Sequence, residues 1–507
     1  MHAENKLSWK KECTAIVEQR DLLLPPAWIA TGSHPGPRHE LGNTIHESGN
    51  LRAMANAVVA LLGQAVQKAV VSSFLLADAA IEEAMLQAAT RGVRVYVLLA
   101  SEARLGAEQG DGEFDRQVLA QHGEMLKKLG GHVLFRSAPH FHAKVVVVDP
   151  DTRPAGMLLT ANLTKEALQR NEELGVVLET SEVVELTGYL GWAMWESAEH
   201  ELLDPGDRFK SAKALGKVPH PRPGPAIVAT TAHWHGMREE MLRLIDGARA
   251  RILVSSFGWD EEHDVVQRLC ARARDGVDVT VLARLRPASM PALIALAEAG
   301  ATVLAFKWLH AKAIWTDQEE ALVMSANLQR HGLDQGFELG VRLRGARAEE
   351  LVQRMETWRD AAPWALALRP RLGDVSGAVK LWHRGEMRDA CIDTLAEVAL
   401  DPVTASSADA LDAPMPAVPR GGELPRLAHA LRCTWSVVAP ALAPRAKEQF
   451  LPGAGDLPPV SYSPAVFKEP GGRIVVGITS PGELARAREV LVAAGAAAIV
   501  VAAGNAR

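Results

Sequence analysis

The sequence of 507 residues contains little cysteine, and its few cysteines are not grouped. They form no Cys-x2-Cys pair and no Cys/His cluster with the spacing of a zinc site. Disulfide-rich secreted domains and zinc modules both need such grouping, so we expect a reducing compartment and no metal or other cofactor. The four are Cys13, Cys270, Cys391 and Cys433.

Long apolar runs are also missing. Residues 1–19 are charged and polar without an apolar centre, which predicts neither a signal peptide nor an anchor. No run reaches the roughly eighteen apolar residues that a membrane span needs. We therefore expect a cytoplasmic protein without stable membrane insertion.

An excess of positive charge is absent as well. The net charge is −6 and the pI is about 6.3, which argues against a general polyanion binder, although a small basic cleft can exist on an acidic protein. No Gly-x4-Gly-Lys-Ser/Thr sequence is present, so an intrinsic nucleotide-driven motor is not expected.

The stretch 141–149 contains a His-x-Lys-x4-Asp pattern that runs into four valines. An apolar run between turn residues is typical of a buried strand. Because alternate side chains of a strand share a face, the pattern predicts that His142 and Lys144 point the same way, with Asp149 at the far end.

The same parts return in the same order later in the chain. Residues 309–317 repeat the pattern with His310, Lys312 and Asp317. In each copy a second strand then ends in a hydroxyl residue, Ala and Asn, and an acid precedes Leu-Gly-Val. Two full sets of these groups indicate a duplicated site. They are Thr160, Asn162 and Glu173 in the first copy, and Ser325, Asn327 and Glu338 in the second.

These two motifs resemble the signature of the phospholipase D superfamily, in which each His-x-Lys-x4-Asp is followed by Gly-Ser-x-Asn. The resemblance covers about residues 50–365. The chain differs where Leu159 and Met324 replace Gly and where Thr160 replaces Ser. The resemblance implies an α/β fold, with two phospholipase D-like α/β sandwich repeats related by a pseudo-twofold axis and sharing one active site.

The resemblance also implies a metal-independent phosphodiesterase that works through a phosphohistidine. By order in the chain, His142 is assigned as the nucleophile and His310 as the general acid. The lysines and the two asparagines, Asn162 and Asn327, would bind the non-bridging phosphate oxygens. Each glutamate is expected to accept a hydrogen bond from the histidine of its own repeat. The supporting residues are Asp149, Thr160, Asp317 and Ser325, and we expect the two aspartates, at the far ends of their strands, to brace the fold rather than to bind phosphate.

The order of predicted elements divides the chain into five parts. Both repeats show a βαβ rhythm, and each closes with a tryptophan-bearing helix. A basic, proline-rich linker separates them. The parts are an N-terminal segment 1–50, the first repeat 51–205, the linker 206–225, the second repeat 226–369 and a C-terminal domain 370–507.

The C-terminal domain lies beyond the resemblance. We predict a helix near residues 380–399, an exposed linker at 401–422 and then a small βαβ unit. That unit consists of strand 473–478, a helix that begins with a capping box at Ser480 and Glu483, and strand 496–501. The domain is a candidate for docking a protein partner.

The motifs alone do not choose the substrate. Arg284 and Arg286, on a loop of the second repeat, and the basic linker favour DNA or RNA, so a nuclease within a nucleic-acid-processing or defence system is the first hypothesis. A phospholipid hydrolase or transferase, similar to phospholipase D or cardiolipin synthase, is an alternative. An inactive nucleic-acid-binding scaffold is another. The oligomeric state is not predicted.

Overall fold

The computed structural model describes residues 12–13, 26–33, 44–107, 113–370, 378–383, 385–391, 475–476 and 500–502. The chain separates into two compact units. Ser33–Pro363 form the larger unit, which contains both motif copies, and Met1–Gly32 with Trp364–Arg507 form the other.

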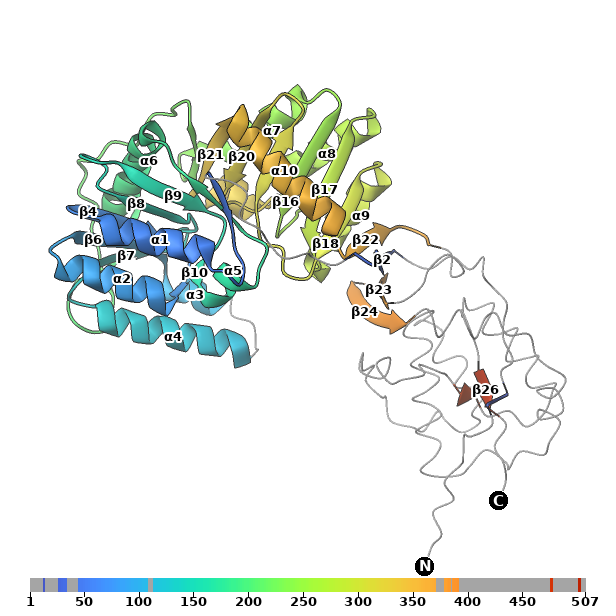
Figure 1. Ribbon diagram of the computed structural model, residues 1–507, viewed down its shortest axis with the longest axis horizontal. Helices are drawn as coiled ribbons and strands as arrows, with labels where there is room; N and C mark the ends of the chain where they lie inside the picture. Colours follow the sequence, from blue (N-terminus) through green and yellow to red (C-terminus); the bar gives the residue numbers. More distant parts are fainter. Residues whose placement is uncertain are drawn as a thin grey trace, which may run out of the picture. The chain divides into compact units, whose positions relative to one another are not determined.

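The first repeat is built on one mixed sheet (Figure 1) with the strand order β13-β12-β7-β6-β4-β8-β9-β11-β3. Its strands are β3 (Ile45–Glu47), β4 (Lys68–Ser72), β6 (Arg94–Ala100), β7 (Leu134–Ala138), β8 (Val145–Val148), β9 (Ala155–Leu159), β11 (Leu174–Val177), β12 (His200–Leu202) and β13 (Lys210–Ser211). The short strands β5 (Leu76–Ala77) and β10 (Leu163–Thr164) pair separately. The helices are α1 (Ala53–Gln64), α2 (Ala79–Thr90), α3 (Glu102–Ala107), α4 (Glu113–Leu129), α5 (Lys165–Gln169) and α6 (Thr180–Trp192), which a π-helix (Ala193–Ser197) continues.

The second repeat has a sheet with the order β15-β14-β21-β20-β19-β16-β17-β18. Its strands are β14 (Ile227–Thr231), β15 (Trp234–His235), β16 (Arg251–Ser256), β17 (Asp278–Arg284), β18 (Thr302–Phe306), β19 (Ala313–Thr316), β20 (Glu320–Met324) and β21 (Glu338–Arg344). The helices are α7 (Gly236–Gly247), α8 (Asp264–Arg274), a 3-10 turn (Pro287–Ser289), α9 (Met290–Glu298), a π-helix (His331–Gln335) and α10 (Ala346–Ala361).

The two sheets repeat one topology. In the first, β4, β6 and β7 are parallel neighbours, and β8, β9 and β11 continue from β4 as antiparallel strands. In the second, β16, β17 and β18 are parallel, and β19, β20 and β21 follow from β16 in the same way. This equivalence confirms the predicted duplication and the α/β fold class.

The valines of β8 show how one strand serves two cores. Val145 and Val147 belong to a hydrophobic core that also contains residues of β20, α6 and α10, so this core is shared by both repeats. Val146 and Val148 face the core beneath α1, α2 and α4, which lie over the first sheet in Figure 1. Burying each valine contributes about 1.5–3 kcal/mol. The alternation follows from the period of two along a strand.

The predicted position of His142 and Lys144 within a strand was wrong. Strand β8 begins at Val145, and the equivalent β19 begins at Ala313, so each His-x-Lys segment lies just before its strand. The reason is that the backbone N–H groups of His142 and Ala143 bond to a carbonyl of the other repeat and not to a neighbour in their own sheet.

The smaller unit contains a sheet with the order β22-β2-β23-β24. Its strands are β2 (Ala27–Ala30), β22 (Trp364–Ala367), β23 (Ala378–His383) and β24 (Glu386–Cys391). The helix predicted near 380–399 was therefore wrong for the described residues, because β23 and β24 form an antiparallel hairpin. Gly385, with φ of +83°, permits the tight turn between them.

The ends of the predicted βαβ unit also lie in the smaller unit. Strand β25 (Val475–Val476) pairs in parallel with β26 (Val500–Ala502), as such a unit requires, and β26 pairs with β1 (Glu12–Cys13). The predicted helix after Ser480 and the predicted linker at 401–422 lie outside the described residues.

Candidate active site

Backbone contacts between the repeats assemble the two motif copies at one place. The carbonyl oxygen of Phe337 accepts hydrogen bonds from the N–H groups of His142 and Ala143, at 3.2 and 2.9 Å. In the matching contact, the carbonyl of Glu172 accepts from His310 and Ala311, at 2.9 and 2.8 Å. Each contact places the residue before the motif glutamate of one repeat against the histidine of the other.

The glutamates consequently serve the opposite histidines. Nδ1 of His142 lies 2.7 Å from Oε1 of Glu338, and Nδ1 of His310 lies 2.7 Å from Oε1 of Glu173. The expectation that each glutamate binds the histidine of its own repeat was wrong. Both glutamates are fully buried, and the bonds fix Nδ1 as the partnered nitrogen, so Nε2 is the ring atom left for chemistry.

Hydroxyl groups hold the second oxygen of each carboxylate. Thr160 donates to Oε2 of Glu173 at 2.7 Å, and Ser325 donates to Oε2 of Glu338. Each hydroxyl also accepts the N–H group that follows its glutamate, that of Leu174 for Thr160, at 2.9 Å. The methyl group that distinguishes Thr160 from serine therefore leaves this hydrogen-bonding role intact.

The site electrostatics keep both carboxylates ionised. Burial by itself would raise the pKa of Glu173, but His310 and Lys312 hold it at about 2. Burial would likewise raise the pKa of Glu338, but His142 and Lys144 lower it. Burial lowers the pKa of both histidines, to about 3 for His310, although the glutamates oppose this change. Both rings are therefore neutral in the free protein at neutral pH.

The two lysines are fully buried beside the histidines. Nζ of Lys144 donates to the carbonyl oxygen of His142 at 2.5 Å, and Nζ of Lys312 donates to that of His310 at 2.6 Å. Nζ of Lys312 also lies 3.1 Å from Nε2 of His310. Burial lowers the pKa of Lys312 to about 7, and Lys144 adds to this effect while Glu173 opposes it.

The two asparagines present unsatisfied polar atoms. Oδ1 of Asn162 and Oδ1 of Asn327 are buried and have no hydrogen-bond partner among the described residues. Leaving such an atom unpaired costs about 1–3 kcal/mol. Because the oxygen and nitrogen of an amide exchange places when the side chain flips, the same positions can present NH₂ groups to a phosphate.

The two aspartates that end the motifs lie away from this chemistry. Asp149 accepts hydrogen bonds from the N–H groups of Val66, Gln67 and Lys68, at 2.8, 2.7 and 2.9 Å. Asp317 does the same for Arg249 and Ala250, at 2.9 Å each. They fasten the far ends of β8 and β19 to the start of the adjacent strand, which is the bracing role expected of them.

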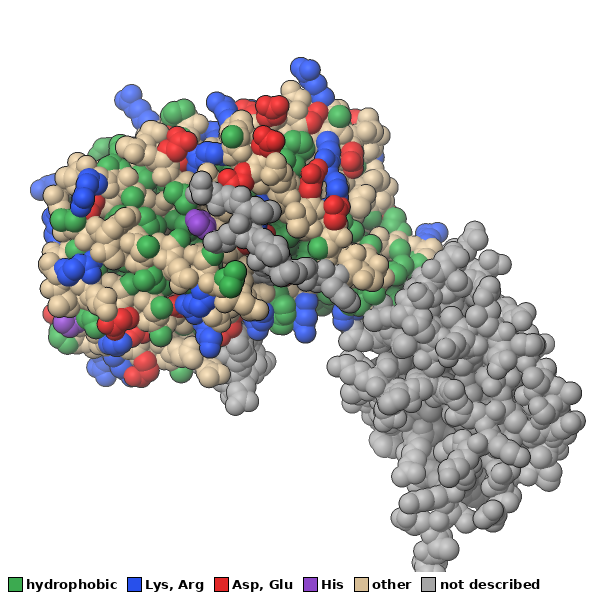
Figure 2. Space-filling model, viewed as in Figure 1, with side chains coloured by type: hydrophobic (Ala, Val, Ile, Leu, Met, Phe, Trp, Pro, Cys, Tyr) green, Lys and Arg blue, Asp and Glu red, His purple; other side chains and the backbone are tan. Residues whose placement is uncertain are grey.

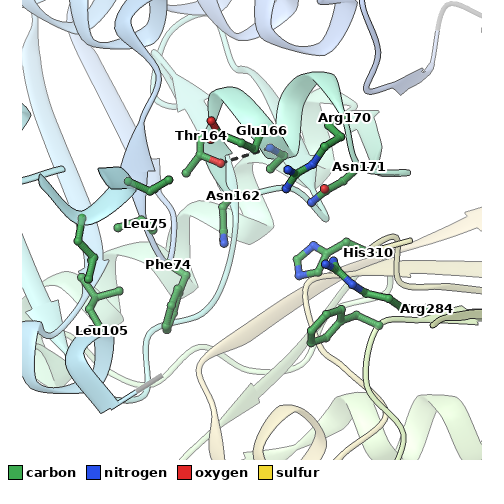
Figure 3. Close-up of a pocket in the computed structure, with 14 residues that line it drawn as sticks. Phe74, Leu75, Leu105, Asn162, Thr164, Glu166, Arg170, Asn171, Arg284 and His310 are labelled. Atoms are coloured by element: carbon green, nitrogen blue, oxygen red, sulfur yellow. Dashed lines mark hydrogen bonds between the residues drawn. The ribbon is translucent and has the colours of Figure 1, made fainter. Parts of the chain in front are cut away.

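A cavity of about 330 Å³ opens onto His310 and Asn162. Figure 3 shows Arg284 and His310 on one side of it, with Phe74, Leu75 and Leu105 across from them. Of the two predicted substrate-binding residues, Arg284 lines the cavity, and Arg286 lies next to it over the ring of Phe257, at 4.6 Å.

Sequence reasoning missed several residues around this cavity. The rings of Phe74 and Phe257 lie edge-on to His142 and His310, with centroids 5.3 and 5.0 Å apart. The equivalent positions of these two phenylalanines in the repeats were a signal that could have found them. Arg170 also lines the cavity, and it was missed because the other repeat has no cation at that position.

The described residues contain neither a cluster of metal-binding side chains nor a membrane-spanning helix. No three His, Cys, Asp or Glu side chains come together there as a metal site. No helix in the described part of the chain has the length and apolar character to cross a bilayer.

Comparison with known proteins now places this geometry in a family. A family model described as cardiolipin synthase, PLD-like domain, matches residues 58–190 and 241–361, and these two blocks correspond to the two repeats. The chain belongs to the phospholipase D superfamily. Phospholipase D enzymes are phosphodiesterases, and the paired His, Lys and Asn groups of this member are suited to that chemistry. A search of the curated proteins gave no match.

Three solved structures are similar to this chain at low identity. Phosphatidylserine synthase from Haemophilus influenzae is 10% identical over 68% of this chain and 90% of its own, with a TM-score of 0.46. Polyphosphate kinase from Porphyromonas gingivalis is 15% identical, with a TM-score of 0.41, over 62% of this chain, which spans 50% of the kinase. Nuc from Salmonella typhimurium, a phospholipase D family member, is 22% identical over 27% of this chain and 96% of its own, with a TM-score of 0.25.

Proposed function

We propose that this phospholipase D-superfamily chain is a metal-independent nuclease that cleaves DNA or RNA through a phosphohistidine intermediate. The observation that carries the choice of nucleic acid is the position of Arg284, whose guanidinium lines the same cavity as His310. On the face drawn in Figure 2, acidic and basic side chains of the described residues are interspersed.

In the first step, Nε2 of His142 attacks phosphorus in line with the leaving oxygen. The N–P bond forms as the P–O bond breaks, and Nε2–H of His310 gives its proton to the leaving oxygen. Binding of the phosphodiester anion raises the pKa of His310, because a nearby negative charge favours the imidazolium. Glu173 stabilises that charged ring before the transfer, at 2.7 Å.

In the second step, His310 takes a proton from water, and the water oxygen attacks phosphorus. The N–P bond breaks and His142 returns as a neutral ring. While the phosphoryl group is bound, the ring of His142 carries positive charge, which the buried carboxylate of Glu338 offsets. Lys144 and Lys312 bind the non-bridging oxygens, with the asparagine amides as further donors.

A phospholipid substrate is the second candidate, and one observation favours it. The lining of the cavity includes the apolar residues Leu75, Leu105, Val118 and Leu119, and Figure 3 shows Leu75 and Leu105 across from Arg284. Such a lining can accept an acyl or glyceryl segment as well as a nucleobase. The substrate assay must therefore contain both classes of phosphodiester.

The test is cleavage of labelled single- and double-stranded DNA and RNA in EDTA, beside hydrolysis of phosphatidylcholine and phosphatidylglycerol vesicles. Wild type is compared with His142→Ala and His310→Ala, and the exposed His132→Ala serves as a matched control. We expect cutting of nucleic acid that both site variants lose and the control keeps. Lipid turnover without cutting would assign the phospholipid candidate, and nucleic-acid binding without turnover would indicate a scaffold.

Trapping the intermediate tests the roles of the two histidines. Acid-free quenching of wild type with substrate, followed by peptide mass spectrometry, should find the phosphoryl group on His142. A label on His310 would reverse the two roles, and a strict requirement for added metal would contradict the mechanism.

A further inference from the structure

Beside His310, cationic and aromatic side chains form a cluster that lies outside the catalytic set. We call it the basic–aromatic cluster, and its members are Arg170, Phe257, Arg284, Arg286, Lys307 and Trp308. The guanidinium carbon of Arg170 lies 3.9 Å from the ring centre of Trp308, and that of Arg284 lies 5.0 Å from the same ring and 5.1 Å from Phe257. Lys307 and Arg286 complete it, at 5.0 Å from Trp308 and 4.6 Å from Phe257.

The cluster breaks the symmetry of the site. The catalytic groups are matched between the repeats, as are Phe74 and Phe257 beside the histidines. The motifs and strand registers give the equivalent of each cluster cation, and none of those equivalents is a lysine or arginine. They are Ala100 for Arg284, Glu102 for Arg286, Pro139 for Lys307 and Gln335 for Arg170, while His140 stands for Trp308.

The cations exceed what one scissile phosphodiester needs. That group carries a single negative charge, and Lys144 and Lys312 already lie beside the histidines. Burial, together with Arg170 and Arg286, lowers the pKa of Arg284, while Glu173 opposes this change. Like charges held this close repel one another, and an additional anion would relieve the repulsion.

Arg284 is also poised to bind a ligand. It is half-buried in the cavity wall, as Figure 3 shows, and it makes no hydrogen bond or ion pair with any described residue. Its contacts are with the faces of Phe257 and Trp308, which leave the edge of the guanidinium available. An arginine held on a ring presents a rigid fork of N–H donors that matches two oxygens of a phosphate.

We propose that the basic–aromatic cluster is a second phosphate subsite, which binds the phosphate next to the scissile one. This inference rests on the proposed nuclease function and narrows it, because the substrate must then be a strand of successive phosphodiesters. A phospholipid with one phosphate would leave the subsite unused. Arg170 and Arg284 bind the phosphate, and Trp308 and Phe257 are positioning residues that orient the guanidinium groups.

The test uses oligonucleotides in which one phosphate beside the scissile linkage is replaced by an uncharged methylphosphonate, on the 5′ side or on the 3′ side. For wild type, one of the two replacements should lower kcat/KM by about tenfold to a hundredfold. In Arg284→Gln and Arg170→Gln the same replacement should have little further effect, because its partner has been removed.

Arg94→Gln is the matched control. Arg94 is an exposed arginine at the start of β6, the end opposite Ala100, and it lines a separate cavity. In Arg94→Gln, the methylphosphonate replacement should lower kcat/KM as much as it does in wild type. The slope of log Kd against log salt for an oligonucleotide should also fall by about one unit in each cluster variant and remain unchanged in the control.

Trp308→Leu and Trp308→Phe test the positioning role. We expect Leu to raise KM with little change in kcat, and Phe to restore most of the loss because a ring face is again present. Equal effects of Leu and Phe on both constants would overturn the positioning role.

Binding measurements separate this inference from the proposed function. In the His142→Ala protein, fluorescence anisotropy gives Kd for the charged and the partly neutral oligonucleotides without turnover. The subsite is supported if one of the methylphosphonate oligonucleotides binds more weakly than the fully charged one and if adding Arg284→Gln removes that difference in affinity. This result would support the subsite whether or not the wild type cuts. Equal affinity for all oligonucleotides overturns the subsite, even if the wild type proves to be a nuclease.

Discussion

At the scale of single residues, the distinctive feature is that each motif histidine is hydrogen-bonded to a carboxylate from the other repeat. Glu338 binds His142 and Glu173 binds His310, each at 2.7 Å. Replacing the glutamate of one repeat should therefore change the tautomer and charge of the histidine in the other repeat. Neither repeat by itself holds a complete histidine–carboxylate pair.

The crossed pairing gives a direct prediction for Glu338→Gln. An amide cannot stabilise the charged ring of His142 as a carboxylate does, so we expect kcat to fall about 100-fold with little change in folding. Proton NMR should show the hydrogen-bonded Nδ1–H resonance of His142 shifted upfield, because an amide oxygen is a weaker acceptor than a carboxylate, and that of His310 unchanged. Glu173→Gln is the matched control and should give the reverse pattern. An upfield shift of the His310 resonance in Glu338→Gln would contradict the crossed assignment.

The pH dependence of the free enzyme is set by Lys312, whose pKa burial lowers to about 7. This lysine is charged below pH 7 and loses its proton above it, so its attraction for phosphate is present on the acidic side and lost as pH rises. Because His310 must also take up a proton when substrate binds, we expect kcat/KM to fall more steeply above pH 7 than below it, by about a further tenfold per unit. Both histidines have lowered pKa values, so they remain neutral throughout that range.

Two variants test whether Lys312 causes the descending limb of the pH profile, the steeper fall in kcat/KM above pH 7. Lys312→Met should lower kcat/KM at pH 6 and remove the limb, whereas Lys213→Met, at an exposed position in the linker, should keep it. A limb that persists in Lys312→Met would belong to another group.

At the scale of single elements, the motif strands are fixed at both ends. The end near the site is held by hydrogen bonds to the other repeat, and Asp149 fastens the far end of β8 to the residues that lead into β4. The histidine and lysine thus project from a segment with little freedom. This rigidity suits catalysis, because the reacting groups need not be ordered when substrate binds.

Asp149→Ala should lower the free energy of unfolding by about 2–4 kcal/mol, because three backbone N–H groups lose a charged partner. Alanine also tolerates the φ of +46° at this position poorly. Asp149→Asn should cost less, since asparagine accepts hydrogen bonds and adopts positive φ readily. Urea denaturation at pH 7 measures both variants, and kcat per folded molecule should stay at the wild-type value.

The pH dependence of this contribution has a definite sign. Burial would raise the pKa of Asp149, but its three backbone hydrogen bonds lower it below the usual 3.8. Its stabilising effect is therefore present above pH 3.8 and lost as pH falls through the lowered pKa. The difference between wild type and Asp149→Asn should shrink accordingly in acid, and a constant difference would contradict the ionised hydrogen bonds.

Sequence patterns predicted some helices and strands correctly and others incorrectly. The βαβ rhythm that the apolar periods predict is present in the first repeat as β4, α2 and β6, because their buried residues recur with regular spacing. A helix was predicted near residues 380–399, but the described residues of this stretch belong to the hairpin of β23 and β24. In that stretch a partner strand outweighs helix propensity, since β2 pairs with β23 and satisfies its backbone.

At the scale of the whole molecule, the larger unit joins two repeats through one core. Residues of β8 and α6 share this core with residues of β20 and α10. Both histidines of a site therefore come from one chain, and the asymmetric basic–aromatic cluster gives the otherwise symmetric site a direction.

A mixing experiment tests this single-chain site. His142→Ala and His310→Ala should each lose about 10³-fold or more in kcat, because the two rings act as a unit. A 1:1 mixture should be no more active than either protein alone. Recovered activity in the mixture would mean that the site is shared between chains, and the exposed His132→Ala provides the positive control.

The sequence by itself determined the chemical groups and their duplication. His142, Lys144 and Asn162 recur as His310, Lys312 and Asn327 in the same order. This order can be read from the sequence because it does not depend on how the side chains pack. The sequence also predicted the bracing role of Asp149 and Asp317, since a polar residue at the end of a buried strand meets the neighbouring backbone.

Only the tertiary structure decided which groups act together. The glutamates cross to the opposite histidines because Phe337 and Glu172 bond to the backbone of the other repeat, a long-range contact that no local pattern encodes. The basic–aromatic cluster likewise joins Arg170 with Arg284 and Trp308, which are distant in the chain. The spacing of residues in a sequence indicates which side chains are neighbours along one helix or strand. Which side chains of different repeats meet is decided only when the two sheets pack around their shared core.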